Sequence, residues 1–177
     1  MTTILEKLRF SQVLPNSFLA NTCAVVSGAV ALSVLSQVSI PLYPVSITLQ
    51  TFGVMLLGLF LTPKNAFFAC LAYLSAATAG LPVLSAGHVN PLWILEPAAG
   101  YLLSFPFAAY LTSVCVRNSY LLSGIAIGQA VTFMMGVAWL SALIGVENAF
   151  WYGFVLFIPG TLLKSAAAYC VGKAKSL

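Results

Sequence analysis

The charged residues of this 177-residue chain are separated by long uncharged runs. The runs cover residues 10–63, 65–95, 97–116, 118–146 and 148–163, which are 54, 31, 20, 29 and 16 residues. A helix needs about 20 mostly apolar residues to cross a bilayer. The spacing of the charges therefore predicts an all-α integral membrane protein with several spans in the lipid bilayer.

The composition supports this class and excludes others. Hydrophobic residues make up 61% of the chain and charged residues only 6%, with no Asp at all, whereas soluble domains carry about 25% charged residues. The formal net charge is +4, but the lysines and arginines are scattered rather than clustered. We therefore expect no nucleic-acid partner.

Prolines, glycines and charged turns divide the sequence into six predicted transmembrane helices. They cover residues 17–37, 47–61, 66–79, 99–114, 121–143 and 159–172. We expect one membrane domain over residues 1–177, with a cytoplasmic or interfacial segment at 1–16, the six-helix bundle at 17–172 and a cytoplasmic tail at 173–177. No A-x-A-type cleavage site ends the first apolar run, so this run is predicted to be a retained span.

The cations predict the orientation of these helices. With six spans, one side holds both termini and the turns 62–65 and 115–120, and the other holds the connections 38–46, 81–98 and 144–158, which carry no Lys or Arg. Because cytoplasmic loops carry an excess of Lys and Arg, both termini are predicted to be cytoplasmic. The cations on that side are Lys7, Arg9, Lys64, Arg117, Lys173 and Lys175.

One cation, Lys164, lies inside an apolar segment. Pro159 fits the first turn of a helix, because its missing N–H would have no intrahelical partner there. A charged side chain at membrane depth costs at least about 2.5–3.5 kcal/mol, so it usually faces a partner or a water-filled cavity. The alternative is a lysine that reaches the interface along its own stem.

Several polar residues are predicted to converge with Lys164 on the outer side. Irregular backbone near a membrane must be satisfied by protein or water, so the long outer connections are expected to fold over a pocket. Its polar residues are Thr48, Gln50, His88, Asn90, Glu96, Tyr101 and Thr161. Three alternatives stay open: the helix residues form interhelical hydrogen bonds, His88 is an exposed loop residue, and Glu96 is a hydrated charge or the counter-ion of Lys164.

Small residues recur every four positions in the first predicted helix, at Ala20, Ala24 and Gly28. They lie on one stripe, which lets another helix approach closely. The sequence leaves open whether that neighbour is internal or belongs to another protein.

Motifs for catalysis and metal binding are weak. The four cysteines show no CxxC spacing and there is one histidine, so we expect no metal site and no cofactor. No G-x-S-x-G frames a nucleophile, and the segment from Gly160 to Ser165 lacks the spacing of a phosphate-binding loop. The chain is therefore not expected to be an enzyme, and uphill transport would need energy from another chain or from an ion gradient.

Four ordered segments resemble the BioY family of biotin transporters, the substrate-binding S components of energy-coupling-factor transporters. They cover residues 44–50 (PVSITLQ), 80–87 (GLPVLSAG), 97–101 (PAAGY) and 158–164 (IPGTLLK). The resemblance implies an S-component-like six-helix bundle in a bacterial cell (inner) membrane, with biotin bound under the outer loops. It also implies an energising module of one further membrane protein and two ATPases, although the chain could work alone.

The resemblance also implies roles for single residues. Lys164, Tyr101 and Gln50 match the family pattern directly, while Thr161 stands where the family usually has Asp. His88 matches as a position, and Glu96 and Leu102 also depart from the pattern. The predicted binding set is completed by Asn90 and Tyr43, and the predicted partner-docking face by Ala20 and Ala24.

The expected pocket suits biotin, which carries a carboxylate, a urea and an apolar thioether ring. A cation, a helix N-terminus at Gly160, hydroxyl and amide groups, and aromatic walls such as Tyr43 or Trp93 match that mixture. A charge-assisted hydrogen bond from Lys164 would contribute about 1.5–3 kcal/mol. Alternatives are a carrier of another vitamin or small organic anion, a solitary biotin facilitator, an intramembrane enzyme and a structural membrane subunit.

Overall fold

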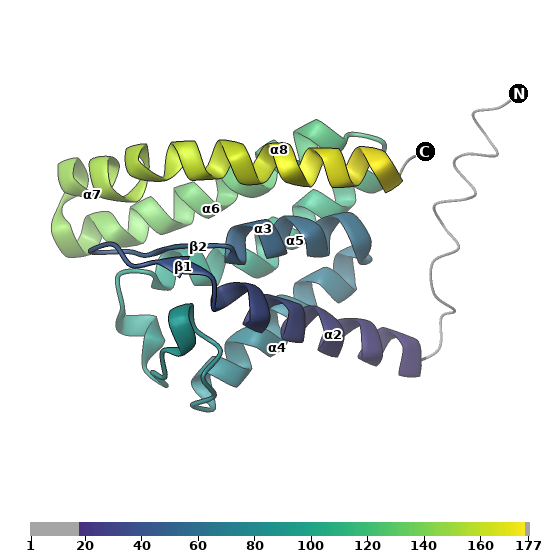
Figure 1. Cartoon of the computed structure of the whole chain (residues 1–177), viewed down its shortest axis with the longest axis horizontal. Helices are drawn as coiled ribbons and strands as arrows, with labels where there is room; N and C mark the ends of the chain where they lie inside the picture. The colour runs from purple at the N-terminus through teal and green to yellow at the C-terminus, as the bar shows by residue number, and fades with distance from the viewer. Residues whose placement is uncertain (1–17, 176–177) are drawn as a thin grey trace, which may run out of the picture.

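The computed structural model describes residues 18–175, and helices dominate it (Figure 1). The predicted segment 1–16, the predicted helix start at Ser17, Lys7, Arg9 and residues 176–177 lie outside the described residues. In chain order the elements are α2 (Phe18–Ser36), β1 (Ser39–Ile40), β2 (Ile47–Thr48), α3 (Gln50–Phe60), α4 (Pro63–Thr78), η1 (Ser85–Gly87), η2 (Trp93–Leu95), α5 (Ala99–Arg117), α6 (Leu121–Ile144), α7 (Val146–Gly153), η3 (Val155–Phe157) and α8 (Ile158–Lys175).

A helix occupies the place of each predicted span, but the helices differ in length. Within residues 18–175, four stretches are long and apolar enough to cross a membrane: Phe18–Ser36, Ala99–Arg117, Leu121–Ile144 and Val146–Ala174. Helix α3 has 11 residues and α4 has 16. At about 1.5 Å per residue both are shorter than the hydrocarbon core of about 30 Å. The predominantly helical architecture is confirmed, and the count of six spans stays a prediction.

The connection between α2 and α3 forms a short antiparallel β-ribbon, which was not predicted from the sequence. Ser39 pairs with Thr48 and Ile40 with Ile47. The predicted start of the second helix at residue 47 is therefore wrong, because the helix begins only at Gln50. Extended backbone suits the β-branched side chains of Ile47 and Thr48.

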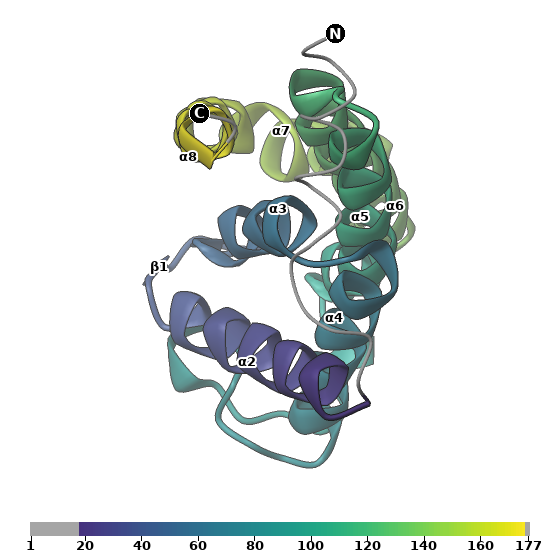
Figure 2. The same cartoon turned by 90° about the vertical axis from the view of Figure 1, so that its right-hand side faces the viewer.

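Helix α3 lies between α2 and α8 in the view along the bundle (Figure 2). It also packs against α5, and most of its residues are buried. Its glycines permit this close packing: a Cβ at Gly53 would lie 2.8 Å from Leu32 of α2, and a Cβ at Gly58 would lie 2.6 Å from Thr112 of α5. Because other helices enclose it, α3 is a central core helix whose first turn reaches the site described below.

The connections between helices sort to two ends of the molecule. The start of α2 and the end of α8 lie at one end, and the β-ribbon and α7 lie at the other, which we call the loop end (Figure 1). The start of α4, which holds Lys64, and the end of α5, which holds Arg117, lie with the two described chain ends, and both cations are exposed. This grouping agrees with the predicted distribution of charge, while the assignment of that side to the cytoplasm stays a prediction.

Candidate functional site

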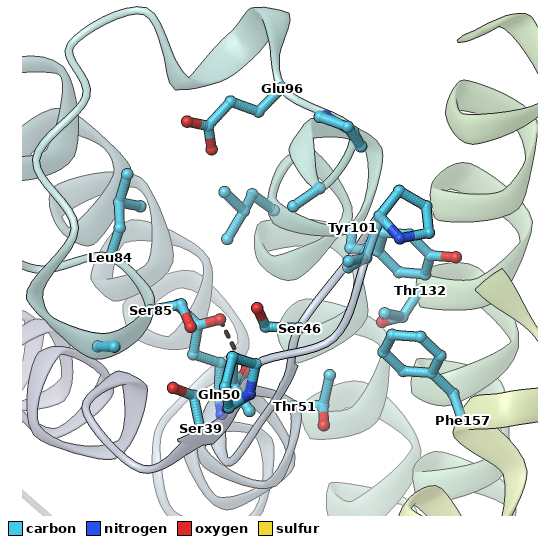
Figure 3. Close-up of a pocket in the computed structure, with 18 of the residues that line it drawn as sticks. Ser39, Ser46, Gln50, Thr51, Leu84, Ser85, Glu96, Tyr101, Thr132 and Phe157 are labelled. Carbon is cyan, nitrogen blue, oxygen red and sulfur yellow. Dashed lines mark hydrogen bonds between the residues drawn. The ribbon is translucent and has the colours of Figure 1, made fainter. Parts of the chain in front are cut away.

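A cavity of about 600 Å³ lies towards the loop end. Its walls come from the β-ribbon, the first turn of α3, residues 84–88 and 96–98, α5, α6, Phe157 and the first turns of α8. Sites for small molecules typically have volumes of about 300–1,000 Å³, so the cavity has a suitable size. In Figure 3, the polar side chains of Ser39, Ser46, Gln50, Thr51 and Ser85 gather on one side of the cavity. The rings of Tyr101 and Phe157 lie on the other side, with Thr132 between them.

Lys164 is the cation of this cavity. Its side chain is only 8% exposed, and its Nζ donates hydrogen bonds to Thr48 O at 2.9 Å and to Thr51 Oγ1 at 3.0 Å. These contacts direct the ammonium to β2 and α3, so the alternative of a lysine extended to the interface is wrong. An ammonium has three N–H donors, and the third has no partner within residues 18–175. Since Lys164 lines the cavity, this donor is available to a ligand.

Glu96 is not the counter-ion of Lys164. Its Oε1 lies 3.0 Å from His88 Nε2 and accepts a hydrogen bond from Asn90 Nδ2 at 2.6 Å. In Figure 3, Glu96 lies well apart from Thr51, the partner of the ammonium. In the described part of the chain no carboxylate pairs with Lys164. The buried ammonium is therefore held by neutral acceptors alone, which leaves it suited to an anionic or strongly polar ligand.

His88 and Asn90 differ in their relation to the cavity. His88 lines it with a side chain that is 57% exposed, which places this residue at the rim. Asn90 is not a lining residue; its Oδ1 accepts from Leu92 N at 2.9 Å while its Nδ2 holds Glu96. Direct binding by Asn90 stays a prediction, and the geometry favours a role in positioning Glu96.

Gln50 belongs to a chain of hydrogen bonds that joins β2, α3 and α4. Thr48 Oγ1 donates to Gln50 Oε1 at 2.8 Å, Gln50 Nε2 donates to Tyr73 OH at 2.5 Å, and Tyr73 OH donates to Val83 O at 2.8 Å. The interhelical alternative is therefore correct for Gln50, which also lines the cavity. One amide hydrogen of Gln50 is left for a ligand.

Tyr101 supplies an aromatic wall. Its hydroxyl donates to Gly153 O at 2.7 Å, so this group is already engaged with α7. Its ring stacks on Phe157, with centroids 5.9 Å apart and an interplanar angle of 10°. The ring packs so closely on α6 that a Cβ at Gly136 would overlap it.

The remaining predicted residues are Thr161, Tyr43 and Trp93. Thr161 lines the cavity three residues before Lys164, hence on the same face of α8. Tyr43 contributes to the rim and is 89% exposed. Trp93 does not line the cavity, because it is buried and its Nε1 donates to Thr78 Oγ1 at 3.0 Å. The expectation of an aromatic wall from Trp93 is wrong.

Several further residues line the cavity that were not predicted from the sequence. They are hydroxyl, aromatic and amide side chains in loops or apolar helices, where no spacing marks them: Ser39, Ser46, Thr51, Ser85, Phe105, Gln129, Thr132, Phe133 and Phe157. One of them carried a readable signal, because Gln129 is the single amide side chain in the apolar stretch 121–144.

The small-residue stripe of α2 packs inside the chain. Ala24 and Gly28 are buried, and a Cβ at Gly28 would lie 2.8 Å from Ala69 Cβ on α4. The neighbour that the sequence left open is thus internal at this position. Partner docking by Ala20 and Ala24 stays a prediction, which the burial of Ala24 does not favour.

The chain is similar in sequence to known proteins, and these proteins belong to one family. A family model described as the BioY family matches residues 7–176. The chain is 30% identical over 174 residues to "Probable biotin transporter BioY" of Rickettsia prowazekii, covering 95% of this chain and 90% of that protein. It is 31% identical over 160 residues to "Biotin transporter BioY" of Rhizobium etli, covering 82% and 85% respectively.

A solved structure shows the same fold. The crystal structure of the S-component for biotin from an ECF-type ABC transporter superposes with a TM-score of 0.78 at 23% sequence identity. The match covers 92% of this chain and 93% of the other.

Proposed function

Because the chain belongs to the BioY family, we propose that it binds biotin in the cavity around Lys164 and mediates biotin uptake. We propose further that it acts as the substrate-binding component of an ATP-driven energy-coupling-factor transporter. The family consists of membrane transport proteins, so the chain is not an enzyme.

The observation that carries this proposal is the ammonium of Lys164. It is buried, it lines a cavity of about 600 Å³, and its third N–H has no partner in the described chain. Biotin offers two strong acceptors, the carboxylate and the urea oxygen. A charge-assisted hydrogen bond from the ammonium to either would contribute about 1.5–3 kcal/mol.

The other walls suit the rest of the ligand. The ring of Tyr101, stacked on Phe157, and the neighbouring Phe105 supply apolar surface for the thioether ring and the aliphatic chain. Burial of apolar surface contributes about 25 cal/mol per Å². The hydroxyl groups around Gln50 supply donors and acceptors to the polar ends of the ligand.

The membrane placement is part of the proposal. We propose that all six helical segments are embedded, with both termini cytoplasmic in a bacterial cell (inner) membrane and the cavity reached from outside. The exposed cations Lys64, Arg117 and Lys173 near the end opposite the cavity support this orientation. The shortness of α3 is compatible with it, because other helices surround α3.

The proposed partner is an energising module of one membrane protein and two ATPases. The chain has no phosphate-binding loop of the G-x-x-x-x-G-K-[ST] type, so ATP-driven uptake requires other chains. Uptake of labelled biotin by cells that lack their own uptake system, with and without the module, tests this proposal. Equal uptake in both would identify a solitary facilitator instead.

Direct binding is the primary test of the proposed function. The purified full chain in detergent is titrated with biotin by calorimetry, and other vitamins and small organic anions serve as comparison ligands. We expect saturable binding of biotin that the comparison ligands do not match. Absence of biotin binding would refute the proposal, and tighter binding of another ligand would replace biotin as the substrate.

A further inference from the structure

Gln129 lines the cavity with a buried amide side chain whose hydrogen bonding is incomplete. It lies in the first half of α6 and is only 8% exposed. Its neighbours in sequence are apolar or small, in the run Ile125-Ala-Ile-Gly-Gln129-Ala-Val131. An amide buried in such surroundings costs free energy unless it is hydrogen-bonded.

The hydrogen bonding of this amide is incomplete. Gln129 Nε2 donates to Met55 Sδ at 3.2 Å, and a thioether sulfur is a weak acceptor. No other hydrogen bond of this side chain is formed within residues 18–175. Every fully shielded side-chain nitrogen and oxygen in that part of the chain has a partner, so the unpaired Gln129 Oε1 keeps accessible surface, and Gln129 lines the cavity.

Two other polar side chains of α6 are satisfied by their own helix. Thr132 Oγ1 donates to Gly128 O at 3.0 Å, and Ser141 Oγ donates to Val137 O at 2.7 Å. These bonds need no ligand. Gln129 differs because its strong donor and its strong acceptor both lack a strong partner, which is the condition expected of a group that meets a ligand.

Met55 connects this amide with α8, the helix that carries the cation of the site. The sulfur of Met55 on α3 also accepts a hydrogen bond from Ser165 Oγ at 3.8 Å. Ser165 follows Lys164 directly on α8, and Met55 lies one turn beyond Thr51, the hydroxyl partner of that lysine. Gln129 and Lys164 both line the cavity, and their partners Met55 and Thr51 lie one turn apart on α3.

We propose that Gln129 recognises the urea of biotin, with Oε1 accepting a urea N–H and Nε2 turning from Met55 to donate to the urea oxygen. This inference rests on the proposed function. A primary carboxamide presents an acceptor and a donor side by side, and one edge of a cyclic urea presents the complementary donor and acceptor. A ligand that lacks the urea leaves the buried amide unpaired, so Gln129 acts as a specificity-determining residue.

The test compares Gln129→Met with the parent chain, using two ligands. Methionine keeps the length and the unbranched shape of glutamine but removes its strong donor and acceptor. The ligands are biotin and tetrahydrothiophene-pentanoic acid, which keeps the thioether ring, the chain and the carboxylate but lacks the urea. Binding to the purified full chain is measured by competition with labelled biotin, and thermal unfolding verifies the fold of the variant.

We expect Gln129→Met to weaken biotin binding by at least about tenfold and to change binding of the urea-free acid by less than about twofold. The matched control is Ser141→Ala, which alters a hydroxyl of the same helix away from the cavity and should leave both affinities unchanged. A purely structural role of Gln129 would lower the affinity for both ligands by the same factor.

Two results would overturn the inference while leaving the proposed function in place: parent-like biotin affinity in Gln129→Met, or equal losses for the two ligands. A parent chain that does not bind biotin would overturn both. The failure of the specificity assignment is therefore distinguishable from the failure of the function.

Discussion

Replacing Lys164 with alanine removes the buried ammonium from the cavity. Two of its three donors are engaged with Thr48 O and Thr51 Oγ1, so one remains for the ligand. Loss of one charge-assisted hydrogen bond corresponds to about 1.5–3 kcal/mol. Because each 1.4 kcal/mol is a factor of about ten in affinity, Lys164→Ala should weaken biotin binding by about 10-fold to about 150-fold.

Calorimetric titration of biotin into the purified chain measures this effect. Lys164→Met serves as a second variant, because it keeps most of the apolar stem while removing the charge, and we expect a loss of the same size. The matched control is Lys64→Ala, since Lys64 is exposed in the first turn of α4 and does not line the cavity. Thermal unfolding of each variant verifies that the bundle is intact.

Equal affinity in Lys164→Ala and the parent would refute the role assigned to the ammonium. A large loss in alanine with little loss in methionine would also contradict it, because packing of the stem rather than charge would then hold the ligand. A loss in Lys64→Ala as large as that in Lys164→Ala would indicate a general effect of net charge.

Three further predictions concern stability and access. Tyr101→Phe should lower the free energy of unfolding by about 1–3 kcal/mol, because Gly153 O loses its hydrogen bond; an unchanged thermal unfolding temperature would contradict this. Gly136→Ala should destabilise the chain by about 1–3 kcal/mol, because the new methyl group overlaps the Tyr101 ring. Gly160→Ala, whose new methyl group would have its nearest neighbours at 3.7 and 3.8 Å, should be tolerated far better in the same unfolding assay. In a background without native cysteines, Thr161→Cys should react with an impermeant thiol reagent added outside and be protected by biotin; labelling only from the cytosol would reverse the proposed orientation.

Local sequence patterns predicted much of the helical architecture. The helices at 99–117 and 121–144 lie close to their predicted bounds, because long apolar runs between charged turns have few other ways to satisfy their backbone in a membrane. The burial of Lys164 beside a cavity was also predictable, since a lone cation in an apolar helix needs a polar environment.

Local sequence patterns could not predict contacts between segments that are distant along the chain. The acceptors of the Lys164 ammonium lie more than 100 residues away, at Thr48 and Thr51. The sequence could not show that Glu96 pairs with His88 rather than with Lys164, because both alternatives are consistent with the same spacing. Nor could it show that the Tyr101 hydroxyl is engaged by Gly153 while only the ring faces the cavity.

The sequence by itself determined the class of protein, the order of its helices and the identity of the cation, because charge spacing and apolar length act locally along the chain. Tertiary structure alone decided which polar groups meet that cation and which stay unpaired. Hydrogen bonds such as that of Gln129 to Met55 depend on how α3 and α6 pack together. Whether two groups form such a bond depends on their distance and direction in three dimensions. The spacing of residues along the sequence specifies neither quantity.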